Sequence, residues 1–207
     1  MKEENVINFY CLCNKLKNVI RTGWTVWNVD RDRLESVAEH VYGVQMLALA
    51  MYSEYKYDID IMKVLYMLSV HEIEEIVIGD LTQFQISNEK KKEIGHEAVS
   101  KVLNGLVLKG SIKNLIEEFD EKKTKEAMFA FYCDKLECDI QSKLYDKEGC
   151  VDLNNQEGNL VMNDKTVKEL LDSGLSWSDM WILFSQKKYN YDDNFLAVSN
   201  YVKKMIY

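Results

Sequence analysis

The chain has 207 residues and a net charge of −8 at pH 7, from 34 acidic and 26 basic residues that are interspersed along its whole length. This pattern leaves no basic stripe to neutralise a nucleic-acid backbone, so we expect no nucleic-acid partner. The longest nearly uncharged run, VYGVQMLALAMYS, is too short to cross a bilayer, and the first ten residues lack the layout of a signal peptide. Five cysteines, an odd number, argue against a disulfide framework. We therefore expect a soluble, cytoplasmic protein with no membrane partner, formed by one domain over 1–207.

The spacing of apolar residues predicts an all-α fold. Proline is absent, and apolar residues recur every three or four positions through most of the chain, as in amphipathic helices. The polar stretch 146–159 predicts a long surface loop between a motif-bearing core, about 20–146, and a C-terminal helical extension, about 160–207. The predicted helices are 4–20, 34–56, 60–78, 88–107, 111–119, 122–146, 164–172, 176–187 and 191–206.

One of the three histidines occupies an unexpected position. In ESVAEHVYGVQMLAL, residues 35–49, His40 falls on the same helical stripe as Val37, Val44 and Leu47. Such a residue is either a hydrogen-bonded core histidine or a metal ligand.

A second segment combines an imidazole with carboxylates. LSVHEIEEIVIGD, residues 68–80, ends an apolar helix with a histidine and three glutamates. On a continuous helix His71 and Glu75 share a face, and Glu72 is still able to reach a site beside the helix end. The alternative interpretation is a solvated helix end.

A third segment, 126–146, places Asp134 within an apolar stripe, where a carboxylate is costly unless it is paired or bound to a cation. Pairing with Lys135 or with an arginine is the alternative. Three distant helices thus place His40, His71 with Glu72, and Asp134 on apolar faces. Two imidazoles and two carboxylates suit a divalent cation, Mn²⁺, Co²⁺, Fe²⁺, Zn²⁺ or Mg²⁺.

The order of these motifs resembles that of a known family. RTGW (21–24), ESVAEH (35–40), HEIEEIVIGDLT (71–82), KKKEIGHEAV (90–99) and EAMFAFYCDKLE (126–137) resemble the HD-domain phosphohydrolases, and among them the 5′-deoxynucleotidases. The resemblance covers about 20–146 and implies an HD-type helical bundle. It assigns the metal ligands to His40, His71, Glu72 and Asp134, with His-Glu in place of the usual His-Asp pair.

The resemblance also implies roles for other residues. Glu75 matches a glutamate that transfers protons, and Asp80 matches a residue near the sugar. Arg21 and Trp24 match the segment that meets the phosphate, where a guanidinium suits bidentate contact. Without the resemblance, Arg21 is equally well an ordinary surface cation, and Trp24 a core residue. A homodimer is implied as well, since relatives are often dimeric.

These observations predict a metal-dependent phosphohydrolase that converts (deoxy)nucleoside 5′-monophosphates to nucleoside and phosphate. Two alternatives stay open: a catalytically weak protein that binds metal and nucleotide, and an HD hydrolase of another nucleotide phosphoester. The apolar C-terminal helices either pack over the bundle or form a dimer interface; their large apolar residues are Trp177, Trp181, Ile182, Phe184, Phe195 and Val198.

Overall fold

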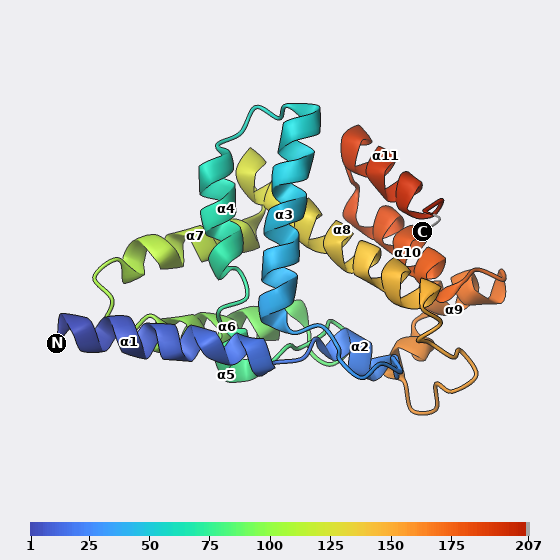
Figure 1. The fold of residues 1–207 in the computed structure, drawn as a ribbon, viewed down its shortest axis with the longest axis horizontal. Helices are drawn as coiled ribbons and strands as arrows, with labels where there is room; N and C mark the ends of the chain where they lie inside the picture. Colours follow the sequence, from blue (N-terminus) through green and yellow to red (C-terminus); the bar gives the residue numbers. More distant parts are fainter. Residues whose placement is uncertain (206–207) are drawn as a thin grey trace. The chain divides into compact units, whose positions relative to one another are not determined.

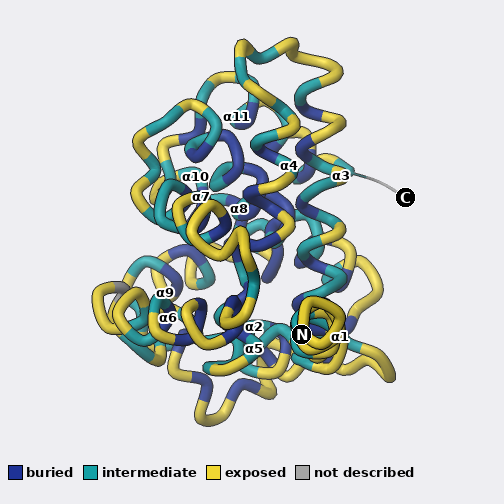
Figure 2. The backbone as a smooth tube through the Cα atoms, turned by 90° about the vertical axis from the view of Figure 1, so that its left-hand side faces the viewer, coloured by how far each residue is buried: buried dark blue, intermediate teal, exposed yellow. Residues whose placement is uncertain are grey.

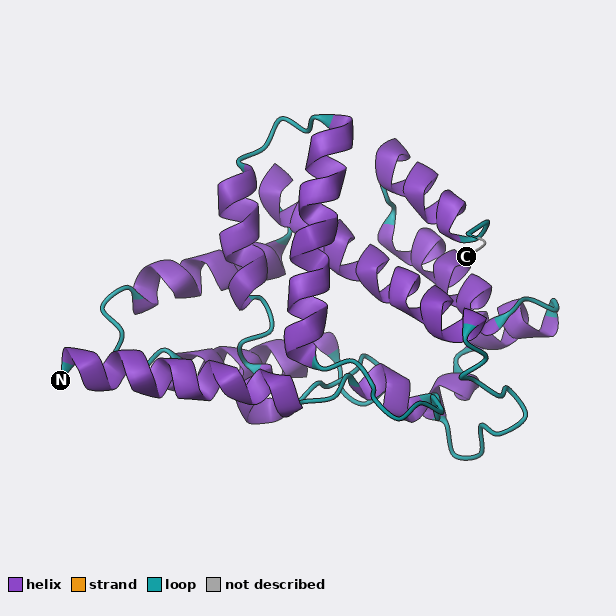
Figure 3. Ribbon diagram, in the orientation of Figure 1, coloured by secondary structure: helices purple, strands orange, loops and turns teal. Residues whose placement is uncertain are grey.

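The computed structural model describes residues 1–205, apart from the side chain of Asn88, and these residues form helices and loops without strands (Figures 1 and 3). The all-α prediction is confirmed. The helices are α1 (Lys2–Cys13), the 3-10 helix η1 (Asn14–Asn18), α2 (Thr22–Val26), α3 (Val37–Tyr55), α4 (Ile61–Val70), α5 (Glu75–Ile78), α6 (Asn88–Val102), α7 (Lys109–Glu121), α8 (Lys125–Lys147), η2 (Leu160–Asn163), α9 (Lys165–Asp172), α10 (Trp177–Tyr189) and α11 (Asp193–Val202). Within the described part, no helix has the length and apolar character needed to span a membrane.

The prediction of one helix over 60–78 is wrong, because the helix is interrupted by a turn at 71–74. The side chain of His71 bonds the Leu68 carbonyl oxygen, an oxygen that would otherwise accept from the Glu72 N–H of a continuing helix. The following backbone bonds span three residues, as from the Ile73 N–H to the Val70 carbonyl, and so tighten the chain. The short helix α2 has no counterpart among the predicted helices, and residue 206 of the predicted last helix lies outside the described residues.

The first of two compact units comprises Met1–Thr22 and Glu35–Phe131. Its apolar core joins the end of α4 to α6 and α7, and the helix α1 lies against it. An ion pair of 2.7 Å between Lys63 on α4 and Glu118 on α7 fixes these two helices at their partly exposed side. The core residues are Val70, Ile73, Val99, Val102, Leu103, Ile112 and Ile116, with Phe9 and Leu12 packed on them.

The second compact unit comprises Gly23–Leu34 and the described residues from Tyr132 onward. Its core is aromatic: Trp24 contacts Tyr145 and Trp177 edge to face, and Trp27 packs on the same Trp177. The long loop predicted at 146–159 is present between α8 and η2, and the Gln156 amide donates to the Trp27 carbonyl within the unit. The single domain over 1–207 remains a prediction.

The C-terminal helices turn their large apolar residues into this second core. Trp177, Ile182, Phe184 and Phe195 are all buried. In Figure 2 the tube of α10 and α11 accordingly carries buried stretches. The sequence left two alternatives for these side chains, packing inside the chain or forming a dimer interface. Their burial favours packing inside the chain.

Candidate metal centre

His40 reaches the interior because of the way in which α3 begins. The Ser36 hydroxyl accepts a hydrogen bond from the Glu39 N–H, and the Glu39 carboxylate accepts one from the Ser36 N–H, so that the two residues form a capping box. This cap starts the helix at Val37 and places His40 one turn later, on the same buried stripe as Val44. The His40 side chain is fully buried.

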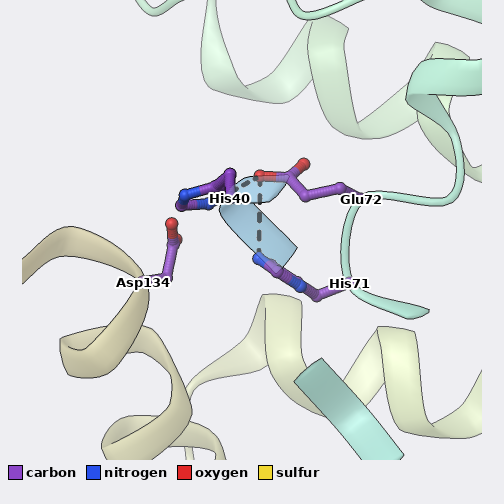
Figure 4. Close-up of side chains that lie close together, drawn as sticks. All are labelled: His40, His71, Glu72 and Asp134. Carbon is purple, nitrogen blue, oxygen red and sulfur yellow. Dashed lines mark ion pairs between the residues drawn. The ribbon is translucent and has the colours of Figure 1, made fainter. Parts of the chain in front are cut away.

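His71 and Glu72 lie in the turn that follows α4. Nδ1 of His71 lies 2.8 Å from the Leu68 carbonyl oxygen. A carbonyl oxygen only accepts hydrogen bonds, so Nδ1 carries a proton and donates it. In the neutral imidazole the lone pair is then on Nε2, which lies 3.7 Å from Oε1 of Glu72. The same Glu72 oxygen lies 4.0 Å from Nε2 of His40, so one carboxylate faces both imidazoles (Figure 4).

Asp134 is a buried residue of α8, and its Oδ2 forms an ion pair of 2.8 Å with Nζ of Lys135. The pairing with Lys135, one of the predicted alternatives, is therefore present. Burial works to lower the pKa of Lys135, but the Asp134 carboxylate outweighs this effect and the pKa is raised. The raised pKa keeps Lys135 charged beside the Asp134 side chain. A carboxyl group binds cations in its ionised form.

Three residues of the first unit form a donor set that fits a divalent cation. His40, His71 and Glu72 each offer a ligand atom, and these atoms all lie within 4.8 Å of one another (Figure 4). Asp134, the fourth predicted ligand, belongs to the second unit. The imidazole of His71 donates its other N–H to a backbone carbonyl, which is how metal-binding histidines are commonly oriented. Its lone pair faces a carboxylate oxygen at a distance too long for a hydrogen bond, an arrangement that a cation between the two atoms stabilises. Mixed nitrogen and oxygen donors suit first-row divalent ions or Mg²⁺.

Glu75 begins α5, one turn after His71, and its side chain is fully buried. Burial raises the pKa of Glu75 well above its usual range, and the negative charges of Glu72 and Asp80 raise it further. Lys91 on α6 opposes this effect through an ion pair of 3.2 Å to Oε1 of Glu75. A buried carboxyl with a raised pKa holds a proton more readily than an exposed glutamate does, a property suited to proton transfer.

Arg21 and Asp80 meet beside this carboxylate cluster. Nη1 of Arg21 lies 3.5 Å from Oδ2 of Asp80 and 3.7 Å from Oε1 of Glu72. The same Asp80 oxygen accepts a hydrogen bond of 2.7 Å from the Thr22 N–H. Gly79 allows this approach, since its φ of +73° turns the chain directly after α5 in a conformation that favours glycine. The guanidinium is thus held near the predicted metal ligands.

Trp24 has a different environment from Arg21, although the two are only three residues apart. Its ring is buried between Tyr145 and Trp177 in the core of the second unit. The core position is the alternative that the sequence alone left open for Trp24.

Sequence reasoning missed two residues with contacts in this region. Lys91 belongs to the run NEKKKE, which looks like any solvated helix start, and only the tertiary structure shows which of its lysines meets Glu75. Thr22 contacts Asp80 across 58 positions of the chain, a pairing that no local pattern signals. The third histidine, His96, forms an ion pair of 2.9 Å with Asp120 and is not part of the metal cluster.

Comparisons with known proteins agree with this arrangement. A family model described as HD domain matches residues 13–171. A relative from Dictyostelium discoideum named 5′-deoxynucleotidase HDDC2 is 32% identical over 152 residues, which cover 70% of this chain and 79% of the relative. The Homo sapiens protein of the same name is 28% identical over 159 residues, 75% of this chain and 73% of that one.

Solved structures share the fold. A conserved hypothetical protein from Pyrococcus furiosus superposes with a TM-score of 0.63 at 23% identity, over 96% of this chain and 99% of its own. A predicted metal-dependent phosphohydrolase from Magnetospirillum magnetotacticum gives a TM-score of 0.64 at 19% identity, over 98% of this chain and 91% of its own. At these identities the likeness concerns the helical fold.

Proposed function

Since the chain belongs to the HD domain family, we propose that it is a metal-dependent phosphohydrolase that releases phosphate from deoxynucleoside 5′-monophosphates. The single observation that carries this proposal is the meeting of His40, His71 and Glu72 within the first unit, where one carboxylate oxygen faces both imidazoles. The names of the relatives, 5′-deoxynucleotidases at 28–32% identity, support the substrate class.

The proposed ligands of the cation are His40, His71, Glu72 and Asp134. Mn²⁺, Co²⁺, Mg²⁺, Fe²⁺ and Zn²⁺ all accept such a donor set. When bound, the cation would neutralise charge on the phosphate and lower the pKa of a water molecule so that it attacks as hydroxide. Glutamate at position 72 retains the charge and oxygen donors of an aspartate but is one methylene longer. Its reach is visible in the contacts of one oxygen with both imidazoles and with Arg21.

The chain's own residues then bind the substrate and move the proton. Arg21, whose Nη1 lies near Asp80 and Glu72, is proposed to donate hydrogen bonds from its guanidinium group to the phosphate. Glu75, with a raised pKa, gives or accepts the proton that hydrolysis of the ester requires. Asp80 is proposed to accept a hydrogen bond from a hydroxyl group of the sugar. One of its oxygens, Oδ2, already accepts a hydrogen bond from the Thr22 N–H.

Trp24 is proposed as a further substrate contact because of its place in the RTGW motif. The support for this role is the motif alone, since the ring packs on Tyr145 and Trp177.

A homodimer in the cytoplasm is part of the proposal. Two neighbouring helices, α3 and α4, expose apolar side chains, and such surfaces commonly mark protein contacts. All five cysteines are free, as is usual in a reducing compartment. The exposed side chains are Tyr42, Met46, Leu49, Met62 and Tyr66.

The decisive experiment measures phosphate release from a panel of deoxynucleoside and ribonucleoside 5′-monophosphates with Mn²⁺, Co²⁺ or Mg²⁺. We expect turnover of at least one deoxynucleoside monophosphate, and none after the cation is removed with a chelator. Nucleotide binding without turnover of any compound would indicate the weakly catalytic alternative. Turnover restricted to nucleoside triphosphates or signalling nucleotides, added to the same panel, would indicate the other hydrolase alternative.

A further inference from the structure

The two oxygens of the buried Glu75 carboxylate have different surroundings. Oε1 lies 3.2 Å from the ammonium nitrogen of Lys91. Oε2 is also buried, and it has no hydrogen-bond partner among the described residues. One oxygen is anchored and the other is available, which is the arrangement that a group transferring a proton to a bound molecule requires.

Lys91 comes from a separate element. It lies near the start of α6, 16 positions after Glu75, and its side chain is only 29% exposed although the neighbouring Lys90 is 58% exposed. Lys90 forms a surface ion pair with Glu93 of its own helix, whereas Lys91 pairs with the buried Glu75 at the start of α5. Burial works to lower the pKa of Lys91, but four surrounding carboxylates outweigh this effect and the pKa is raised. These carboxylates are those of Glu72, Glu75, Glu74 and Asp80.

From these contacts we infer that Lys91 is a positioning residue: its ammonium group fixes one oxygen of Glu75 so that the other points to the reacting phosphate ester. This inference rests on the proposed phosphohydrolase function. It extends that function to α6, a helix that contributes none of the predicted ligands.

The physical reason is the freedom of a carboxylate. Without an anchor, the glutamate side chain samples several rotamers, and only a fraction of them directs an oxygen to the substrate. Small misplacements of a reacting group are costly, since a shift of about 1 Å lowers rates by about 100-fold. The ion pair with Lys91 selects one orientation before the substrate binds.

The test is a kinetic comparison of four proteins at saturating cation: wild type, Lys91→Met, Lys91→Arg and the matched control Lys90→Met. We expect kcat of Lys91→Met to fall by about 10- to 100-fold while KM changes by less than about threefold. Arginine donates from nearly the same position, so Lys91→Arg should regain most of the lost kcat. Lys90→Met, one residue away on the surface, should behave as wild type, and all four should bind equal amounts of metal.

Two results would overturn the inference. One is an unchanged kcat in Lys91→Met; the other is a KM raised more than about tenfold at unchanged kcat, which would mean that Lys91 itself contacts the substrate. If Lys91→Met does not fold, Lys91→Gln takes its place, since it retains the polar end while losing the charge.

Crystal structures of wild type and Lys91→Met separate this inference from the proposed function, because they need no turnover. We expect one orientation of the Glu75 carboxylate in wild type and a rotated or divided one in the variant. The same orientation in both would overturn the role of Lys91 even in an active enzyme. A wild type without activity on the whole panel would instead contradict the proposed function.

Discussion

The two compact units bury ionisable groups for different purposes. In the first unit one oxygen of Glu72 faces the imidazoles of His40 and His71, and burial together with the charge of Glu72 raises the pKa of Glu75. In the second unit the buried Asp139 receives a hydrogen bond of 2.8 Å from the Ser185 hydroxyl. Its surroundings are those of a structural core.

This difference separates the residues that we expect to act in binding and catalysis from those that we expect to stabilise the fold. The buried charges of the first unit are costly unless a cation or a substrate compensates them, whereas the aromatic rings around Trp177 stabilise the second unit directly. We therefore expect substitutions in the first cluster to change binding and activity, and substitutions in the second core to change stability.

The largest expected effect follows from His71→Ala. Loss of its imidazole removes a proposed ligand, and metal affinity should fall by more than about 100-fold, since even changes to groups that merely orient ligands cost up to this much. Metal content after dialysis and phosphate release measure the effect, and both should be abolished while the fold is retained. His96→Ala, which removes a histidine paired with Asp120, is the control and should retain its metal. Unchanged metal content in His71→Ala would rule out ligation by this residue.

The second expected effect concerns the aromatic core. Trp177→Ala removes a fully buried ring that packs on Trp24 and Trp27, and should lower the free energy of unfolding by about 3–5 kcal/mol. Denaturant unfolding measures the change. Trp177→Phe retains most of the ring and should cost clearly less. Equal stability of wild type and the alanine variant would contradict the division between the two units.

A third, smaller effect depends on pH. Burial raises the pKa of Asp139 well above its usual range, although the Ser185 hydroxyl and Lys135 work against this. Below about pH 4, where the unfolded carboxyl is also protonated, the group makes its full contribution to stability; that contribution is lost as pH rises towards the folded pKa. Asp139→Asn can still accept the Ser185 hydrogen bond and never ionises. Its advantage in unfolding free energy over wild type should grow from about pH 4 to 8. A constant difference across this range would show that Asp139 is not held neutral.

The smallest effect is expected for Glu72→Asp. Aspartate offers the same ligand oxygens, so activity should be retained within about threefold, or raised, if glutamate is merely tolerated at this position. Steady-state phosphate release and metal titration measure this outcome. A strong loss would show that the site is built around the longer side chain, which reaches Arg21 as well as the two imidazoles.

The sequence predicted the helical fold and the proposed ligand set because both correspond to local patterns of apolar and polar residues. Apolar spacing shows a helix, and a histidine or an aspartate on an apolar stripe shows a polar group directed inward, as the burial of His40 and Asp134 confirms. The interruption of the predicted helix at 71–74 has no such pattern in the sequence, because it depends on a hydrogen bond from the His71 ring to the Leu68 carbonyl oxygen. A single continuous helix was the simpler interpretation.

Sequence by itself therefore determined which segments are helical and which polar residue types lie on their apolar stripes. Only the tertiary structure decided their partners: Lys91 with Glu75, Thr22 with Asp80, and the Trp24 ring with the aromatic core. The physical reason is that burial follows from periodicity along one helix, whereas an ion pair or hydrogen bond between distant segments depends on how the helices pack. Lys91 of NEKKKE pairs with a buried carboxylate and its neighbour Lys90 pairs with Glu93 at the surface, and no local pattern distinguishes the two lysines.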